Sequence, residues 1–228
     1  MNSAAAPSAS PRSPSTRSTR FRRKNCTKKA ISLAGLTGNE RVLDAYCGIG
    51  TIGLIASRDA REVISVELNP DAVRDAVTNA KRNQIKNVSF YQNDAGAFMV
   101  SMAEKGEKAD IVFMDPPRAG SDEAFLSSVV TLSPKKVVYV SCNPETLARD
   151  LRYLTKHGYK AEEAWGYDMF AWSEHVESIV LLSKLKSNKL KHINVELEMD
   201  ELDLMAAESK AIYAEVKDYV SEAKRIES

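Results

Sequence analysis

Residues 42–54 read VLDAYCGIGTIGL, a short apolar run followed by a turn that holds three glycines. The aliphatic residues of the run predict a buried strand, and the residues from Thr51 onward predict a helix. A strand, a glycine turn and a helix in this order form the first unit of a parallel sheet, in which ligands bind outside the carboxyl ends of the strands. This stretch therefore predicts an α/β fold with a ligand site at the end of its first strand.

The same alternation of strand and helix continues along the chain. The two last strands are separated by a connection at 166–175 and are expected to close the sheet as an antiparallel pair. Strands are expected at 42–45, 63–67, 88–91, 111–114, 137–140, 159–165 and 176–182, and helices at 28–34, 51–57, 70–83, 97–103, 123–130 and 144–155. The prediction is a Rossmann-like fold with a mostly parallel seven-stranded sheet and helices on both faces.

Charge divides the chain into three segments. Residues 1–29 carry eight Arg or Lys and no acid, which leaves a net charge of −7 for the other 199 residues of a chain whose total is +1. We expect 1–27 to be a disordered basic tail, 28–185 to be the folded domain and 186–228 to be an acidic, partly helical extension, with its helix at 204–223. The tail resembles an organellar transit peptide, and it also suits RNA contact through its basic residues Arg20, Arg22, Arg23 and Lys24.

The cysteines and histidines predict neither a disulfide scaffold nor a metal site. Cys26, Cys47 and Cys142 lack metal-ligand spacing, and the three histidines are scattered. Reduced thiols are typical of a cytoplasmic protein, and a metal ion or iron–sulfur cluster is not expected. No apolar run approaches the ~20 residues that cross a bilayer, so no membrane partner is expected. We expect a monomer, although the sequence carries no direct signal for oligomeric state.

Two acids accompany the glycine turn. Gly48 and Gly50 leave room for a ligand against the backbone, a pattern shared by nicotinamide enzymes, flavoproteins and methyltransferases. Glu67 ends the second strand, where an acid commonly binds the hydroxyls of an adenosine ribose. Asp44 precedes the glycines, where it would attract the ammonium of a methionine moiety and repel a pyrophosphate. S-adenosylmethionine is therefore favoured over NAD, and a turn without a ligand is the remaining alternative.

Two further strands end in reactive side chains. The fourth is followed by Asp115-Pro116-Pro117-Arg118, where the prolines stiffen the chain, and the fifth by Cys142. A lone cysteine is more often a small core residue than a nucleophile. A D-P-P tetrad also marks adenine amino-methyltransferases, but those have an aromatic residue where this chain has Arg118. The best candidate for a general base is Glu177, at the start of the last strand.

Taken together, these motifs resemble the RNA uracil-C5 methyltransferases, and in particular the branch that modifies bacterial 23S ribosomal RNA. The resemblance covers about residues 30–184. It rests on VLDAYCGIGTIGL at 42–54, VELNPDAV at 66–73, NAKRNQIKNVSFYQND at 79–94, DPPRAG at 115–120, VVYVSCNPETLARDL at 137–151, DMF at 168–170 and HVES at 175–178.

The resemblance implies an S-adenosylmethionine-dependent methyltransferase fold and a uridine in RNA as the substrate. Carbon 5 of uracil is a poor nucleophile, and addition of a thiolate to carbon 6 activates it. The catalytic residues implied are Cys142 as the nucleophile and Glu177 as the base, with Asp115 and Arg118 beside them. The cofactor contacts implied are Tyr46, Glu67 and Asp115, with Thr51 and Asp94 as further lining positions.

The chain also departs from the family pattern. Family members carry an RNA-binding β-barrel and a cofactor-contacting F-x-Q segment upstream, whereas the first glutamine here is Gln84. Ala171-Trp172-Ser173 replaces the Pro-containing turn that usually follows DMF. A truncated catalytic domain is therefore expected. Two hypotheses remain open: an active RNA (uracil-5-)-methyltransferase, and a module that binds the cofactor without turnover.

Overall fold

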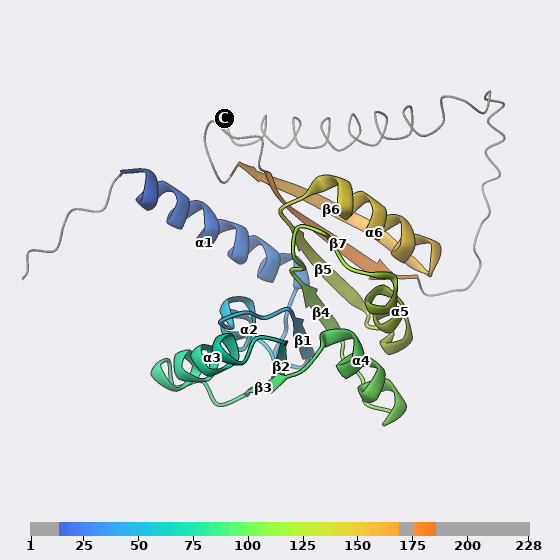
Figure 1. The fold of residues 1–228 in the computed structure, drawn as a ribbon, viewed down its shortest axis with the longest axis horizontal. Coiled ribbons are helices and arrows are strands. Elements are labelled where there is room, and N and C mark those ends of the chain that lie inside the picture. Colours follow the sequence, from blue (N-terminus) through green and yellow to red (C-terminus); the bar gives the residue numbers. More distant parts are fainter. Residues whose placement is uncertain (1–13, 169–175, 186–228) are drawn as a thin grey trace, which may run out of the picture.

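A computed structural model of the chain describes residues 14–168 and 176–185 (Figure 1). Six helices and seven strands occur within them. In chain order they are α1 (Pro14–Ala34), β1 (Arg41–Ala45), α2 (Thr51–Ala56), β2 (Glu62–Glu67), α3 (Pro70–Arg82), β3 (Val88–Gln92), α4 (Ala95–Glu104), β4 (Ile111–Met114), α5 (Glu123–Leu132), β5 (Lys136–Ser141), α6 (Pro144–Lys156), β6 (Tyr159–Asp168) and β7 (Val176–Lys184). The helix expected at 204–223, residues 1–13 of the basic tail, and His175 lie outside the described residues.

The strands form one seven-stranded sheet in the order β3-β2-β1-β4-β5-β7-β6. β1 to β5 are parallel, whereas β7 lies antiparallel between β5 and β6. The mostly parallel sheet and its antiparallel closing pair confirm the predicted fold. Since β7 runs in the opposite direction, its first residues lie at the edge where the parallel strands end.

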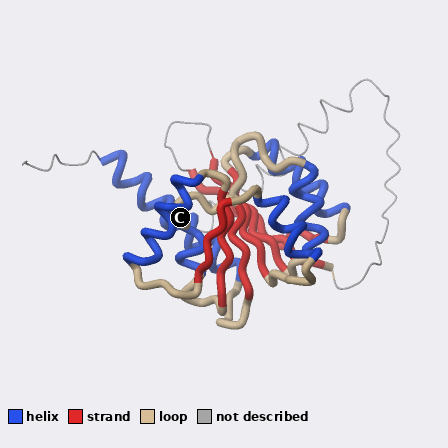
Figure 2. Tube along the Cα trace, turned by 60° about the horizontal axis from the view of Figure 1, so that its bottom comes forward, coloured by secondary structure: helices blue, strands red, loops and turns tan. Residues whose placement is uncertain are grey.

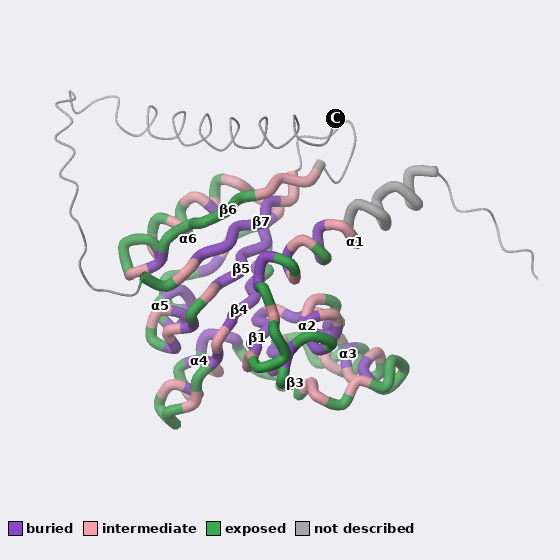
Figure 3. The backbone as a smooth tube through the Cα atoms, turned by 180° about the vertical axis from the view of Figure 1, so that it is seen from behind, coloured by how far each residue is buried: buried purple, intermediate pink, exposed green. Residues whose placement is uncertain are grey.

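Each face of the sheet is covered by its own set of helices (Figure 2). Successive strand residues point to opposite faces, so Leu43 and Val112 pack against α4, α5 and α6, while Val42 and Phe113 pack against α1 and α2. The central strands are buried on both sides (Figure 3), which explains why they read as continuous apolar runs in the sequence. The packed sheet therefore holds the strand ends in place, and with them the start of each loop that follows.

Helix α1 corrects one sequence prediction. We expected a disordered tail to residue 27 and a helix from Lys28, but the helix begins at Pro14. The reason is tertiary packing: Cys26, Ala30 and Ala34 lie on one face of α1 and are buried against the sheet. A helix nucleus fixed in this way extends at low cost through residues whose own helix propensity is modest. Within the described residues, neither α1 nor any other helix is long and apolar enough to cross a membrane.

The helix caps explain two smaller features. Asn69 caps α3 by accepting hydrogen bonds from the backbone N–H groups of Asp71 and Ala72, as its position before Pro70 predicted. Helix α4 begins at Ala95, two residues earlier than expected, because Asp94 is its N-cap and accepts from the N–H of Ala97.

Candidate functional site

The predicted site residues lie at the ends of strands that meet at one edge of the sheet. Glu67 ends β2, Asp115 follows β4, and Cys142 follows β5. β7 starts at the same edge with Val176 and Glu177, because it is antiparallel to β5. The pairing of these two strands ends at Ser141 and Ser178, one residue before Cys142 on β5 and one residue after Glu177 on β7. The topology thus places the predicted nucleophile and the predicted base at the same edge.

Cys142 differs from the two other cysteines in its exposure. Cys26 and Cys47 are buried, whereas Cys142 is half-buried. The turn that carries it is rigid, because the Ser141 hydroxyl donates to the Asn143 carbonyl oxygen at 2.9 Å and accepts from the Asn143 N–H at 3.1 Å. Asn143 then caps α6 by accepting from the N–H of Glu145. Cys142 is therefore a thiol held on a fixed turn and reachable from solvent, which favours a reactive residue over a core residue.

Carboxyl groups gather at this edge and perturb one another. Burial raises the pKa of Asp44 to about 7, and the charges of Asp115 and Glu67 add to this rise. Desolvation by the surrounding protein, together with the charge of Glu177, raises the pKa of Asp115 to about 7 as well. Asp115 is nevertheless exposed to solvent, so solvent screening makes this value an upper bound. A cluster of this kind attracts a cation and repels anions.

Cys26 shows how close α1 comes to the site. Burial raises the pKa of the Cys26 thiol to about 12, and the negative charges of Glu177 and Asp115 contribute to the rise. Cys26 is therefore kept as a neutral thiol behind this edge of the sheet. Helix α1 forms part of the wall on this side of the sheet.

The glycine turn after β1 contains residues with positive φ angles. Tyr46 has a φ of 61°, which a non-glycine residue rarely adopts, and Gly48 has a φ of 53° with open space where a Cβ would lie. The Glu67 carboxylate accepts from the N–H groups of Gly48 and Asn69, both at 2.9 Å. The end of β2 therefore supports the turn after β1, and the backbone at Gly48 remains accessible to a ligand.

Two residues that were expected to face the ligand, Gly50 in this turn and Asp44 in β1, are packed inside the protein. At Gly50, with a φ of 84°, a Cβ would meet Ala76, Leu54 and Phe90 at 3.3 Å, so this glycine makes room for protein packing. Asp44 is 1% exposed, and its Oδ2 accepts from the Gly53 N–H at 2.8 Å. Asp44 therefore braces the start of α2 from the interior.

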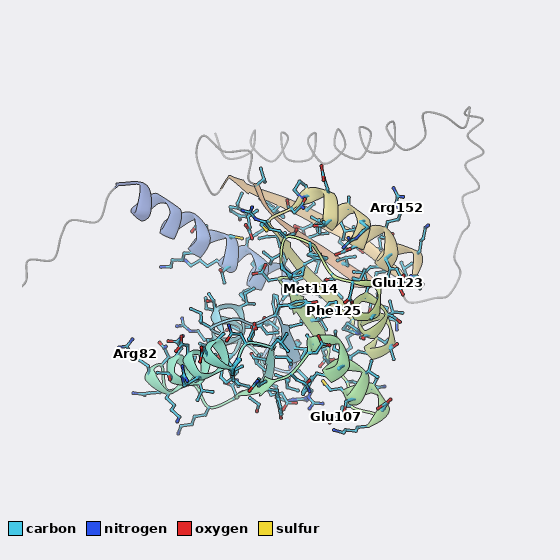
Figure 4. All side chains as sticks on the ribbon, viewed as in Figure 1. Arg82, Glu107, Met114, Glu123, Phe125 and Arg152 are labelled. Atoms are coloured by element: carbon cyan, nitrogen blue, oxygen red, sulfur yellow. The ribbon has the colours of Figure 1, made fainter. Side chains whose placement is uncertain are left out.

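The other predicted residues lie around the rim of the site. Tyr46 packs its ring against Phe125, with centroids 4.8 Å apart. Thr51 is the exposed first residue of α2, Asp94 is the exposed N-cap of α4, and the exposed Arg118 lies in the loop after β4. Figure 4 shows Met114, which ends β4, and Phe125 at the centre of this region.

Two apolar side chains were missed by the sequence reasoning. Ile49 and Leu68 are 52% and 67% exposed, although large aliphatic residues are usually buried. They follow Gly48 and Glu67 and therefore flank the glycine turn. Exposed apolar residues on both sides of a turn can provide the walls for a flat aromatic base. The signal in the sequence is an aliphatic residue directly after each of two predicted ligand contacts, Gly48 and Glu67.

The match of the chain to a protein family agrees with this geometry. The sequence model of the tRNA (uracil-5-)-methyltransferase family matches residues 28–185, which include every predicted catalytic and cofactor position. The chain belongs to this family. It is therefore related to RNA methyltransferases, as the motifs at the strand ends indicated.

Individual members of the family support the same assignment. An uncharacterised RNA methyltransferase of Halalkalibacterium halodurans is 47% identical over 154 residues, which is 68% of this chain and 34% of that protein. One from Caldanaerobacter subterraneus is 47% identical over 157 residues, which is 69% of this chain and 35% of that protein. The chain thus spans about one third of the length of these curated relatives.

A solved structure of the same family resembles this fold. It is the Pyrococcus abyssi tRNA (uracil-54, C5)-methyltransferase in complex with S-adenosyl-L-homocysteine, with a TM-score of 0.59 and 32% identity over 69% of this chain and 37% of that one. A putative RNA methyltransferase from Pyrococcus horikoshii has a TM-score of 0.58 at 18% identity and covers 78% of this chain and all of that one, which supports the fold alone.

Proposed function

We propose that this chain transfers a methyl group from S-adenosylmethionine to carbon 5 of a uridine in RNA, with Cys142 as the nucleophile. The observation that carries the proposal is the antiparallel pairing of β5 with β7, which ends at Ser141 and Ser178 and so brings Cys142 and Glu177, one residue further on, to one edge of the sheet, with Asp115 at the same edge. This chemistry needs a thiolate, a general base and a cofactor pocket at one place. The family membership supports an RNA substrate.

The chain's own residues divide the reaction between them. The Cys142 thiolate adds to carbon 6 of the uracil and makes carbon 5 nucleophilic. After methylation, the Glu177 carboxylate removes the proton from carbon 5, the bond between Cys142 and carbon 6 breaks, and the double bond returns. Arg118 would steady the uracil or the cofactor side of the pocket, and Asp115 would contact S-adenosylmethionine. The uracil must leave its stack to reach this edge. The reaction so written requires no metal ion.

The glycine turn fits S-adenosylmethionine, whose sulfonium supplies the electrophilic methyl group. Glu67 would bind the ribose hydroxyls, and the exposed Ile49 and Leu68 would flank the adenine, with Tyr46, Thr51 and Asp94 around them. Burial is the main cause of the raised pKa values of Asp44 and Asp115, and neighbouring carboxylates add to both, so a cationic ligand would favour their ionised forms. The same carboxylates would repel a pyrophosphate, which disfavours a nicotinamide cofactor.

The RNA is proposed to approach along α1. Lys24 and Lys28 are exposed on this helix, near the edge where Cys26 is within the electrostatic range of Asp115 and Glu177. Basic side chains beside the pocket would bind phosphates on either side of the target. Ribosomal RNA is the substrate suggested by the motifs, and transfer RNA is suggested by the family description. We propose a cytoplasmic monomer for the active form.

Trapping of the covalent adduct tests the proposal directly. RNA that contains 5-fluorouridine should form a stable complex with the protein in the presence of the cofactor, because the fluorine cannot be removed as the proton is. Transcripts of 23S ribosomal RNA and of tRNA should be compared, with Cys142→Ala as the matched control. The proposal fails if neither RNA gives an adduct that depends on Cys142. Calorimetric binding of the cofactor without any adduct would instead support a binding module without turnover.

A further inference from the structure

The loop that carries Asp115 and Arg118 is tied to the segment that carries Cys142. Residues 115–122 connect β4 to α5, and side chains of residues 143–150 make five hydrogen bonds to the backbone of residues 118–121. Asn143 Nδ2 donates to the Arg118 carbonyl oxygen at 3.1 Å, and Thr146 Oγ1 donates to it at 3.4 Å. The segment that carries Cys142 therefore also holds the loop that carries Asp115.

Arg149 and Asp150 form the centre of this attachment. Arg149 Nη2 donates to the carbonyl oxygens of Ala119 at 3.1 Å and Ser121 at 2.7 Å, while its Nε donates to Asp150 Oδ1 at 2.8 Å. Asp150 is fully buried, and its Oδ2 accepts from the Ser121 N–H at 2.8 Å and from the Tyr139 hydroxyl at 2.6 Å. The planar guanidinium is suited to such a set of bonds, which lysine cannot reproduce.

The packing around the loop leaves little freedom. Gly120 has a φ of 74°, and a Cβ there would lie 2.6 Å from Arg149 Nη2 and 2.9 Å from both Asp150 Oδ2 and the Cβ of Thr146. The close fit shows that the loop backbone lies directly on the Arg149–Asp150 pair. Ser121 continues the contact inward. Burial raises the pKa of both Tyr46 and Tyr139, and the nearby Ser121 side chain offsets part of each rise, although the Ser121 Oγ has no hydrogen bond of standard geometry.

We propose that the Arg149–Asp150 pair is a positioning element that sets the distance of Asp115 and Arg118 from Cys142. This inference rests on the proposed function. Tyr139, on β5, lies only three residues before Cys142, so Asp150 is bonded both to the strand that leads to the nucleophile and to the loop that carries its partners. Loss of the hydrogen bonds from the Arg149–Asp150 pair would let the loop at residues 115–122 move, while the glycine turn after β1 stays in place. A displacement of about 1 Å at reacting groups can cost ~100-fold in rate.

Arg149 is the residue to change, because its side chain is 56% exposed and its loss leaves no cavity in the core. Arg149→Ala should slow adduct formation with the 5-fluorouridine transcript roughly 10- to 100-fold, and Arg149→Lys should lie between it and the wild type. Arg152→Ala is the matched control: it removes the same residue type one turn further along α6, at the outer end of that helix (Figure 4). It should leave the rate unchanged.

Two measurements separate positioning from general damage. The Kd for S-adenosylhomocysteine should change by a smaller factor than the adduct rate in Arg149→Ala, because Glu67 and the glycine turn are not on this loop, while amide hydrogen exchange at Ser121 should become faster. A parallel loss of cofactor affinity, thermal stability and adduct rate would overturn the proposal, as would a wild-type adduct rate in Arg149→Ala. If the wild type itself gives no adduct, the proposed function fails. Hydrogen exchange at Ser121 then tests by itself whether the Arg149–Asp150 pair holds the loop, and unchanged exchange in Arg149→Ala would refute that role.

Discussion

The buried carboxyl of Asp44 makes the stability of this protein depend on pH. Its pKa is raised from 3.8 in an exposed carboxyl to about 7, chiefly by burial. The native state therefore binds this proton more tightly than the unfolded state. The resulting stability is fully present below pH 3.8 and is lost as the pH rises to 7. At about 1.4 kcal/mol per pH unit, the swing amounts to about 4 kcal/mol.

The substitution Asp44→Asn tests this reasoning. The amide oxygen of asparagine can still accept from the Gly53 N–H, but the side chain cannot ionise. The variant should therefore be similar to the wild type near pH 4 and more stable above pH 7, with about 2 kcal/mol of the difference appearing between pH 5 and pH 7. Urea unfolding followed by circular dichroism at intervals from pH 4 to pH 8 measures it.

Asp110 provides a control of opposite sign. It lies at the amino end of the sheet. Burial is the largest single effect on its pKa and would raise it, but Lys135 and the Arg41 N–H together outweigh burial and lower the pKa. Its ionised form therefore stabilises the fold above its unfolded pKa, and that contribution is lost as the pH falls. Asp110→Asn should destabilise the protein more at pH 7 than at pH 4. A constant difference between Asp44→Asn and the wild type across the whole range would refute the argument.

Three further substitutions follow from single contacts. Gly53→Ala would place a Cβ 2.6 Å from Ser65 Oγ, so it should lower the free energy of unfolding by about 1–3 kcal/mol, measured by urea denaturation. Tyr139→Phe removes the 2.6 Å hydrogen bond to Asp150 and should lower the free energy of unfolding by about 1.5–3 kcal/mol. A decrease of less than about 0.5 kcal/mol, which is the size expected for a neutral surface substitution, would contradict this prediction. Asn69→Ala removes the N-cap of α3 and should lower the stability by about 1 kcal/mol, with Asn69→Asp retaining most of it.

The sequence predicted the sheet well because its strands have two buried faces. Runs such as Val137–Val140 are apolar throughout, and only a strand covered by helices on both sides requires this. The helix at 70–83 was equally clear, because Asn69 and Pro70 mark its start. Helix α1 was predicted too short, since Ser, Thr and Arg give little local signal and the burial of Cys26 and Ala30 depends on strands distant in sequence.

The candidate site was predicted as a set of residue types, but its internal contacts were not. The glycine turn appeared as a ligand site at both Gly48 and Gly50, yet only the structure shows that Gly50 is filled by packing. The role of Arg149 and Asp150 was also invisible, because a charged pair on an amphipathic helix normally faces solvent. Hydrogen bonds to a loop nearly thirty residues away carry no local periodicity that a sequence reveals.

The residue order along the chain predicts the chemical groups at the strand ends: an acid and glycines at the first, an acid ending the second, Asp115 after the fourth and Cys142 after the fifth. This is possible because alternating apolar strands and amphipathic helices define the fold class, and the polar residues then fall at the strand ends. Which of these groups share an edge depends on the three-dimensional fold. The antiparallel pairing of β7 with β5 brings Glu177 to the edge that carries Cys142, and burial makes Asp44 an internal brace, since pairing and desolvation both depend on neighbours that are remote in the chain.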